Sequence, residues 1–169
     1  MIDDAARRPG HARPAPVVVR DAAGADLDAV MAIMGAAFEP TYGEAWTRSQ
    51  CAGILPMAGV ALRLASRDDG AIAGFALMRV IADEAELLLI AVDPAARQAG
   101  VGTALVDDFI ARAGDGGARR LHLEVRDGNQ AIGIYERAGF ALVGRRRDYY
   151  RGTDGHKRDA LTLASERLG

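Results

Sequence analysis

Short apolar stretches along the chain follow two patterns, one typical of strands and one typical of helices. Runs that are β-branched, alternating or continuously apolar predict strands at residues 17–20, 60–66, 72–81, 85–92, 119–126, 140–146 and 160–164. Apolar residues three or four positions apart predict helices at residues 27–38, 47–56, 101–113 and 132–139. The chain therefore mixes strands and helices.

Three local signals refine this picture. The run at residues 85–92 is almost entirely apolar and ends at Asp93-Pro94, which predicts a central strand buried on both faces. The cluster Arg67-Asp68-Asp69-Gly70 between two strands is typical of a hairpin turn. Asp26 precedes the first helix, where we expect its carboxylate to cap the helix, and Gly139 is expected to end the last one.

With 169 residues, the chain is long enough to form one domain with its own core. The formal net charge of −2 argues against a dedicated nucleic-acid-binding protein, which normally presents a strongly basic face. No apolar window approaches the ~20 residues that cross a bilayer. We therefore expect neither nucleic acid nor a membrane as a direct partner.

The sequence contains few cysteine and histidine residues, the types that form disulfides or bind metals. Cys51 is the single cysteine, which excludes an intrachain disulfide and suits a reducing cytoplasm. The three histidines lack the spacing of metal ligands, so no metal site is expected.

Residues 1–16 contain charges and prolines but no apolar signal-peptide core, and we interpret them as a disordered leader. The predicted domain spans residues 17–166.

The strongest local chemical signal follows the run at residues 85–92. Arg97, Gly100 and Gly102 stand in a short loop just before a predicted helix. A helix N-terminus offers unpaired N–H groups and a partial positive charge, which suit a pyrophosphate, and glycine lets the backbone approach its oxygens. The spacing is neither G-x-G-x-x-G nor that of a P-loop. A simple glycine-rich turn before a helix is the alternative interpretation.

The segment VDPAARQAGVGTALVDDFI resembles the signature motif of the GCN5-related N-acetyltransferases, the GNAT family, whose loop binds the phosphates of acetyl-CoA. The resemblance runs over almost all of residues 17–166 and implies an α/β (α+β) GNAT fold. Such a fold has a mixed, mostly antiparallel sheet with helices on both faces. It also implies that the sheet splays at its centre, between residues 87–92 and 119–125, and that acetyl-CoA enters the split as co-substrate.

Within the family, the chain looks most like the bacterial ribosomal-protein-alanine N-acetyltransferases. The similar segments are ADEAELLLIAVDP, LHLEVRDGNQAIGIYERAGF and RRRDYYRGTDGHKRDALTL. This resemblance implies acetyl transfer to a protein α-amino group, such as the N-terminal alanine of a ribosomal protein, by direct attack in a ternary complex. The alternatives are a GNAT enzyme that acetylates a small-molecule amine and a non-catalytic acyl-CoA-binding regulatory module.

The resemblance also implies roles for individual residues. Glu124 matches the glutamate that acts as general base, and Tyr135 matches the tyrosine that acts as general acid. Both roles suit the chemistry, because the attacking amine must lose a proton and the departing thiolate benefits from a nearby donor. The expected cofactor contacts are Ile90, Ala91, Val92, Arg97, Gln98, Ala99, Gly100, Val101, Gly102, Thr103 and Asn129. The expected acceptor contacts are Glu39, Glu44, Trp46, Tyr149 and Tyr150.

Several of these assignments have alternatives. Glu124 can be an ordinary solvated carboxylate, His122 on the same strand face can serve as base, and Tyr135 can serve packing alone. Asn129 precedes Tyr135 by six residues where the family has seven, so Gly128 is an alternative for the cofactor-contacting position. The acceptor contacts can be exposed loop residues. We also expect a bulge at residues 90–92 whose backbone N–H groups stabilise the oxyanion.

Overall fold

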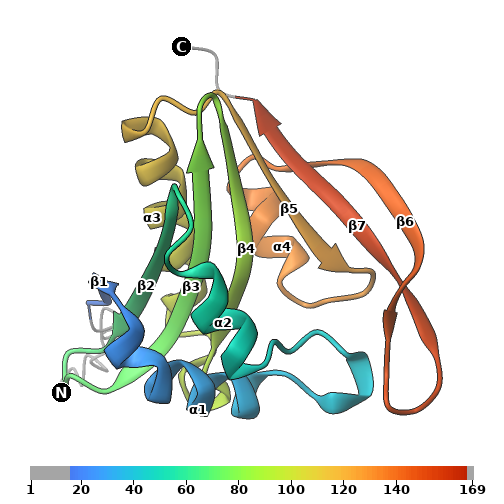
Figure 1. Ribbon diagram of the computed structural model, residues 1–169, viewed down its shortest axis with the longest axis horizontal. Helices are drawn as coiled ribbons and strands as arrows, with labels where there is room; N and C mark the ends of the chain where they lie inside the picture. The colour runs from blue at the N-terminus through green and yellow to red at the C-terminus, as the bar shows by residue number, and fades with distance from the viewer. Residues whose placement is uncertain (1–15, 167–169) are drawn as a thin grey trace, which may run out of the picture.

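The computed structural model describes residues 16–166, so residues 1–15 of the predicted leader lie outside the described residues. Its centre is a seven-stranded sheet with the order β1-β2-β3-β4-β5-β7-β6 (Figure 1). Neighbouring strands are antiparallel except for the parallel pair β4 and β5. The strands are β1 (Val18–Ala22), β2 (Val60–Ser66), β3 (Ile72–Ile81), β4 (Glu84–Val92), β5 (Arg120–Arg126), β6 (Ala141–Arg151) and β7 (Lys157–Glu166).

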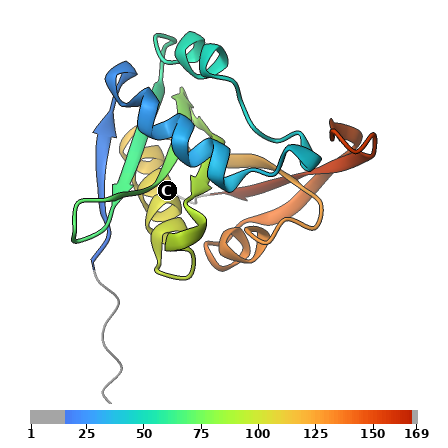
Figure 2. The same cartoon turned by 90° about the horizontal axis from the view of Figure 1, so that it is seen from below.

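Helices cover both faces of this sheet (Figure 2). Helices α1 and α2 pack with Leu64 and Phe75 on one face, and α3 and α4 pack with Met78 and Leu123 on the other. The mixed, mostly antiparallel α/β fold is thus confirmed. The helices are α1 (Leu27–Ala37), α2 (Arg48–Ile54), α3 (Val101–Asp115) and α4 (Ile132–Arg137), with short turns η1 (Gly24–Asp26), η2 (Pro40–Tyr42) and η3 (Pro94–Ala96). Within residues 16–166, no helix has the length and apolar character to cross a membrane.

Helix α1 shows how the apolar spacing becomes a buried face. Val30 and Met34, one turn apart, are both buried, and each such side chain contributes about 1.5–3 kcal/mol. Asp26 stands at the N-cap position, but its carboxylate accepts from Arg20 and from the N–H of Ala23 instead of a helical N–H. The predicted cap is therefore wrong, because donors in the preceding turn take the carboxylate.

Strand β4 carries a β-bulge at Leu88, two residues before the predicted position at 90–92. The extra residue reverses which side chains point to which face. Leu87 consequently packs in the core under α3, whereas Leu89 packs in the core under α1. The prediction that β4 is buried on both faces is wrong, because residues such as Ile90 are only half-buried.

The sheet splays directly after this bulge, as expected. Parallel pairing between β4 and β5 ends at the register pair Leu87 and Leu123. Beyond this pair the two strands separate, and the second half of β4 keeps β3 as its partner. The second half of β4 therefore has a free edge on the side of β5.

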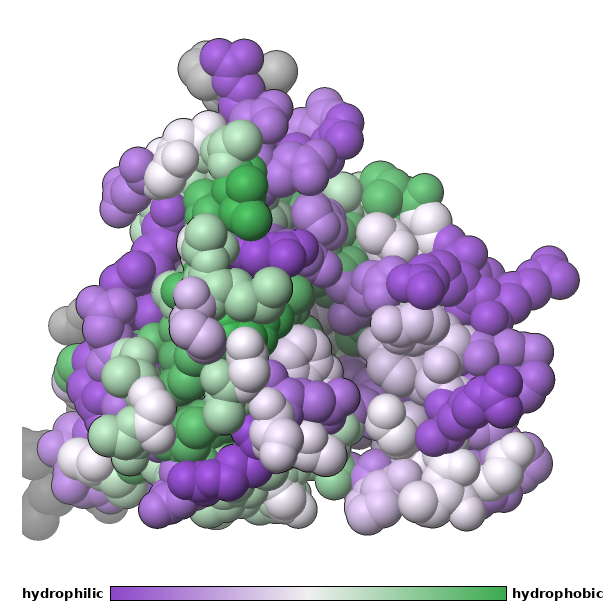
Figure 3. Space-filling view, in the orientation of Figure 1, coloured by the Kyte–Doolittle hydropathy of each residue, from purple (hydrophilic) through white to green (hydrophobic). Residues whose placement is uncertain are grey.

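The last two strands are longer than predicted and form a long hairpin. Strand β6 continues to Arg151, and β7 begins at Lys157. Most of β6 is exposed, and this side of the molecule is largely hydrophilic (Figure 3). The pairing is interrupted between Arg146 and Tyr150, where Asp148 has a φ of 55°. The extension was not predicted from the sequence, because its residues are mostly charged and show no alternation of apolar and polar positions.

Candidate active site

A pocket lies where β4 and β5 diverge. Its volume is about 180 Å³, and its lining comes from β4, β5, the start of α4, the segment after α1 and the β6–β7 hairpin. Glu39, in contrast, is exposed and is not part of the lining. The residues expected from the sequence that line the pocket are Glu44, Trp46, Ile90, Glu124, Asn129, Tyr135, Tyr149 and Tyr150.

Glu124 alternates along β5 with the buried residues Leu123 and Val125, which leaves it half-buried at the pocket. Its two carboxylate oxygens accept hydrogen bonds from Nη1 of Arg146 on β6, at 2.9 and 3.3 Å. The Glu124 side chain is 27% exposed, which differs from a freely solvated carboxylate. The arginine thus holds a carboxylate at the edge of the pocket.

His122 lies on the same strand face but has another neighbour. Its Nε2 is 3.9 Å from Oε1 of Glu86, whose other oxygen accepts from Arg79 at 3.0 Å. Glu86 lines the pocket, whereas His122 does not. The geometry therefore favours Glu124 over His122 as a base. Glu86 was missed by the sequence analysis, although a carboxylate inside the apolar run at residues 85–92 is a signal that was available.

Tyr135 stands on α4 with its ring in the core. The residue is 4% exposed, and its ring meets that of Phe140 edge-on with centroids 6.4 Å apart. Burial raises the pKa of the Tyr135 phenol well above its ordinary value, and the nearby charge of Glu44 adds to this effect. Because Tyr135 also lines the pocket, it offers a neutral hydroxyl donor there at physiological pH.

The predicted phosphate loop joins β4 to α3 through η3. Gln98 and Gly100 both adopt left-handed backbone conformations, with φ of 62° and 81°. Gly100 is the N-cap of α3, and the first helical bond runs from the N–H of Ala104 to its carbonyl oxygen at 2.9 Å. The N–H groups of residues 101–103 precede this bond and have no acceptor within the helix. They are available to an anion.

Gly102, predicted in the loop, lies in the first turn of α3, and it differs from Gly100 in what a side chain would meet. A Cβ at Gly100 would meet no atom within 4 Å, so the left-handed backbone and not crowding requires glycine there. A Cβ at Gly102 would lie 3.0 Å from Cδ1 of Ile134 on α4 and 3.7 Å from Val92. Gly102 therefore allows α4 to pack closely, and a large residue there would disturb the fold as well as a ligand.

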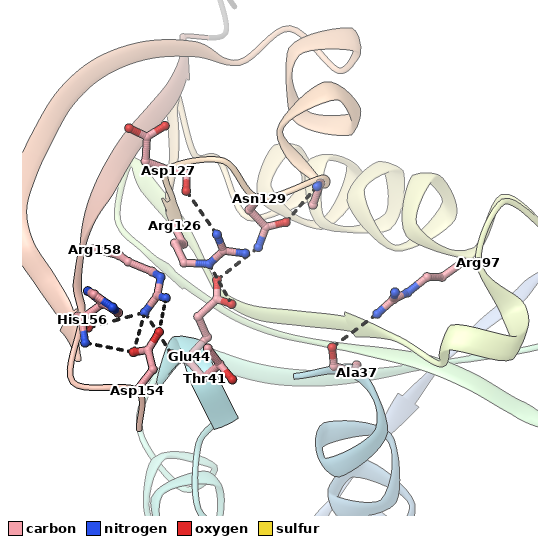
Figure 4. A network of polar contacts seen from close by, with 11 residues as sticks. Ala37, Thr41, Glu44, Arg97, Arg126, Asp127, Asn129, Asp154, His156 and Arg158 are labelled. Carbon is pink, nitrogen blue, oxygen red and sulfur yellow. Dashed lines mark hydrogen bonds and ion pairs between the residues drawn. The ribbon is translucent and has the colours of Figure 1, made fainter. Parts of the chain in front are cut away.

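The side chain of Arg97 points from this loop toward the end of α1 (Figure 4). Its Nη2 donates to the carbonyl oxygen of Ala37 at 3.3 Å. A cation is favoured at a helix C-terminus, because the helix dipole is negative there. Phe38, the next residue along the chain, lines the pocket and was not expected to do so. Arg97 thus links the loop to the segment that forms one pocket wall.

The free edge of β4 carries backbone donors. The N–H of Asp93 donates to the carbonyl oxygen of Ala73 on β3 at 2.8 Å. Because N–H directions alternate along a strand, the N–H groups of Ile90 and Val92 point away from β3, into the split, whereas that of Ala91 points toward β3. Two of the three expected backbone contacts therefore face the space between β4 and β5.

These donors fit the acetyl-CoA that the resemblance implies. The start of α3 offers free N–H groups for a pyrophosphate, and at Gly100 no Cβ stands in the way. The edge of β4 can pair with an extended, amide-containing arm through Ile90 and Val92. Among the described residues, no three side chains of the metal-binding types come together.

Asn129 begins the turn into α4, and its side chain has partners at both ends (Figure 4). Its Oδ1 accepts from the N–H of Ala131 at 2.8 Å, and its Nδ2 donates to Oε1 of Glu44 at 3.1 Å. Gly128 has a φ of 80° and serves the turn. Asn129 lines the pocket and Gly128 does not, which favours Asn129 as the ligand-facing residue.

Aromatic side chains form the outer wall of the pocket. The rings of Tyr149 and Tyr150 meet at a steep angle with centroids 5.0 Å apart, and Trp46 approaches from the segment before α2. Burial raises the pKa of Tyr150 well above its ordinary value, and the charges of Glu44 and Glu124 contribute. This wall can contact an acceptor that reaches Glu124.

A family model described as "Acetyltransferase (GNAT) family" matches residues 27–140. The ribosomal protein bS18-alanine N-acetyltransferase of Escherichia coli K12 is 43% identical over 97 residues, which are 57% of this chain and 65% of that protein. The chain thus spans slightly less than two thirds of this curated relative. The protein of the same name from Salmonella typhimurium is 40% identical over 104 residues, which are 61% of this chain and 70% of that protein.

Solved structures share the fold of this chain. The crystal structure of the E. coli ribosomal-protein-S18-alanine N-acetyltransferase superimposes with a TM-score of 0.78 and 31% identity, over 91% of this chain and 97% of that chain. A phosphinothricin acetyltransferase from Sinorhizobium meliloti, solved in complex with AcCoA, shares the fold at 20% identity and a TM-score of 0.75, over 89% and 88% of the two chains. The match over 27–140 and the similarity of the structures lead to one conclusion: the chain belongs to the GNAT family of acetyltransferases.

Proposed function

We propose that this chain is an acetyl-CoA-dependent N-acetyltransferase that acts on a protein α-amino group, in particular the N-terminal alanine of a ribosomal protein. The observation that carries the proposal is the split after Leu87 and Leu123, where the free edge of β4 borders a pocket lined by Glu124 and Tyr135. The similarity to the E. coli enzyme supports the choice of acceptor. We place the reaction in the cytoplasm, where ribosomal proteins are made and a thiol such as Cys51 stays reduced.

On the donor side, the chain binds and orients acetyl-CoA, which supplies the activated acetyl group. The N–H groups of residues 101–103 hold the pyrophosphate at the start of α3. The N–H groups of Ile90 and Val92 hold the extended arm along β4. A backbone donor at this edge also stabilises the negative charge that develops on the carbonyl oxygen during transfer.

On the acceptor side, Glu124 removes the proton that the attacking amine must lose, directly or through one water. An α-amino group has a pKa of ~8, so a carboxylate held by Arg146 needs to give only modest help. Tyr135 is protonated near neutral pH, as phenols ordinarily are, and donates that proton to the departing sulfur.

The acceptor chain lies against Trp46, Tyr149 and Tyr150. The first residue of the acceptor must share a pocket of about 180 Å³ with the thioester, and a methyl side chain takes up least of that space. The carboxylate of Glu86 also lines it, which favours a positively charged acceptor over an acidic one.

The direct test is turnover against a panel of amines, followed as release of free thiol from acetyl-CoA. Peptides that begin with alanine and carry arginine or lysine within the next few residues should be acetylated efficiently. Faster reaction with spermidine or an aminoglycoside would favour the small-amine alternative. Binding of acetyl-CoA without turnover on any amine would favour a non-catalytic module.

A further inference from the structure

The segment between α1 and α2 contacts the β6–β7 hairpin, although 117 residues separate Thr41 from Arg158. We call residues 40–44 the latch. Nη1 of Arg158 donates to the carbonyl oxygen of Thr41 at 3.0 Å, and the N–H of Thr153 donates to that of Pro40 at 3.4 Å. Figures 1 and 2 both show this segment beside the tip of the hairpin. The latch therefore connects the segment after α1 to the β6–β7 hairpin, and both of these elements border the pocket.

Two glycines permit this bridge. A Cβ at Gly43 would overlap the carbonyl oxygen of Arg151, and a Cβ at Gly152 would overlap that of Thr41. Gly43 also has a φ of 68°, in the left-handed region that favours glycine. Backbone thus meets backbone at two points, so the spacing between the latch and the hairpin is set by direct contact.

Glu44 fixes the inner end of the latch (Figure 4). Its side chain is 10% exposed, and Oε2 lies 3.3 Å from Nε of Arg126, which is 14% exposed. Oε1 accepts from Asn129 at 3.1 Å. The ring of Tyr42 lies against the guanidinium groups of Arg126 and Arg158, at 3.8 and 4.8 Å from its centroid. Removing one partner of such a buried ion pair leaves the other charge uncompensated.

We propose that Glu44 is a positioning residue, which holds the two walls of the acceptor pocket at a fixed separation. Trp46 follows Glu44 by two residues, and Tyr150 precedes Arg151, whose carbonyl packs on Gly43. Glu44 acts on both walls through Arg126 and the latch. This inference rests on the proposed function, because it assigns Trp46 and Tyr150 to the acceptor.

The Glu44→Gln variant tests this role. Glutamine has the same size and can still accept from Asn129, but it lacks the charge that faces Arg126. The peptide KM should rise by about tenfold, which corresponds to about 1.4 kcal/mol, while the Kd for acetyl-CoA should stay unchanged. Arg126→Gln should have the same effect, and the double variant should be no worse than the more affected single one. As a matched control, Glu84→Gln removes an exposed ion pair with Arg120 and should change neither constant.

Hydrogen exchange supplies a readout that does not depend on activity. In Glu44→Gln, backbone amides at residues 40–46 and 152–158 should exchange faster, and those of α3 should not change. Unchanged exchange in both segments would overturn the positioning role. Failure of the wild-type chain to acetylate any peptide would instead overturn the proposed function, and the exchange measurement would still test the positioning role. An unchanged peptide KM, an equal loss of acetyl-CoA affinity, or additive effects in the double variant would also overturn it.

Discussion

The carboxylate of Glu124 on β5 accepts hydrogen bonds from Nη1 of Arg146 on β6, at 2.9 and 3.3 Å. The contact ties the proposed base to the edge strand and keeps its oxygens beside the pocket. Arginine stays protonated, so Arg146 can orient the carboxylate but cannot accept a proton in its place. Substitutions at the two positions should therefore differ in severity.

Glu124→Gln removes the proton acceptor and keeps the size of the side chain. Turnover should fall by ~10²–10⁴-fold, the usual contribution of general-base catalysis, while calorimetry should find acetyl-CoA affinity nearly unchanged. Raising the pH should restore part of the rate, because more of the amine is then neutral. His122→Gln should keep the wild-type rate. A loss in that variant, with full activity in Glu124→Gln, would make His122 the base.

Arg146→Gln should reduce turnover less than Glu124→Gln does, since the proton acceptor is still present but less well oriented. Arg146→Lys should recover much of the loss, because an ammonium group can also donate to Glu124. Steady-state kinetics on the three variants tests this order. A loss in Arg146→Gln as large as that in Glu124→Gln would contradict a purely orienting role.

Gly100→Ala tests the phosphate loop against a matched control. Gly100 and Gly117, at the two ends of α3, both have a φ of 81°, and a Cβ at either would meet nothing within 4 Å. Alanine should therefore cost about 1–2 kcal/mol of stability at both positions. Only Gly100→Ala should weaken acetyl-CoA binding, by about tenfold or more in calorimetry, because its Cβ enters the proposed phosphate site. Equal affinities in the two variants would contradict the assignment.

Tyr135 and Tyr150 should titrate later than ordinary phenols, because burial raises the pKa of both. In an absorbance titration, part of the tyrosinate signal should be missing near pH 10 in the folded protein and should appear when urea unfolds it. The folded state then binds more protons than the unfolded state, so the free energy of unfolding should fall as the pH rises above about 10 and should be unaffected below it. Tyr135→Phe should remove part of the delayed signal. A full signal near pH 10 in the folded wild type would contradict the burial of these groups.

Elements with a clear hydrophobic signal could be predicted from the sequence. The bounds of β2 and β3 agree with the predicted 60–66 and 72–81, because apolar runs flank an Asp/Gly turn. The far part of the β6–β7 hairpin could not be predicted, because Asp148 and its charged neighbours are exposed and show no apolar alternation. The bulge was predicted at residues 90–92 but lies at Leu88, because an extra apolar residue within an apolar run does not change the hydrophobic pattern.

The candidate site divides in the same way. The resemblance gave Glu124 and Tyr135, and both line one pocket. The partners of the site residues could not be predicted, because Arg146 and Arg126 come from elements whose approach is set by the tertiary fold. Glu39 illustrates the reverse case: it lies in the expected segment, yet the turn η2 leaves it exposed and outside the pocket.

The most direct test of the central claim is to locate the acetyl group on a peptide that begins with alanine and carries an internal lysine. The α-amine is more often neutral than the ε-amine near pH 7, with pKa values of ~8 and ~10.4, so it is the better substrate for a carboxylate base such as Glu124. Mass spectrometry of the product should place acetyl on the N-terminal alanine alone, and blocking that amine should abolish the reaction. Acetylation of the lysine in the blocked peptide, at the rate of the free peptide, would contradict the account.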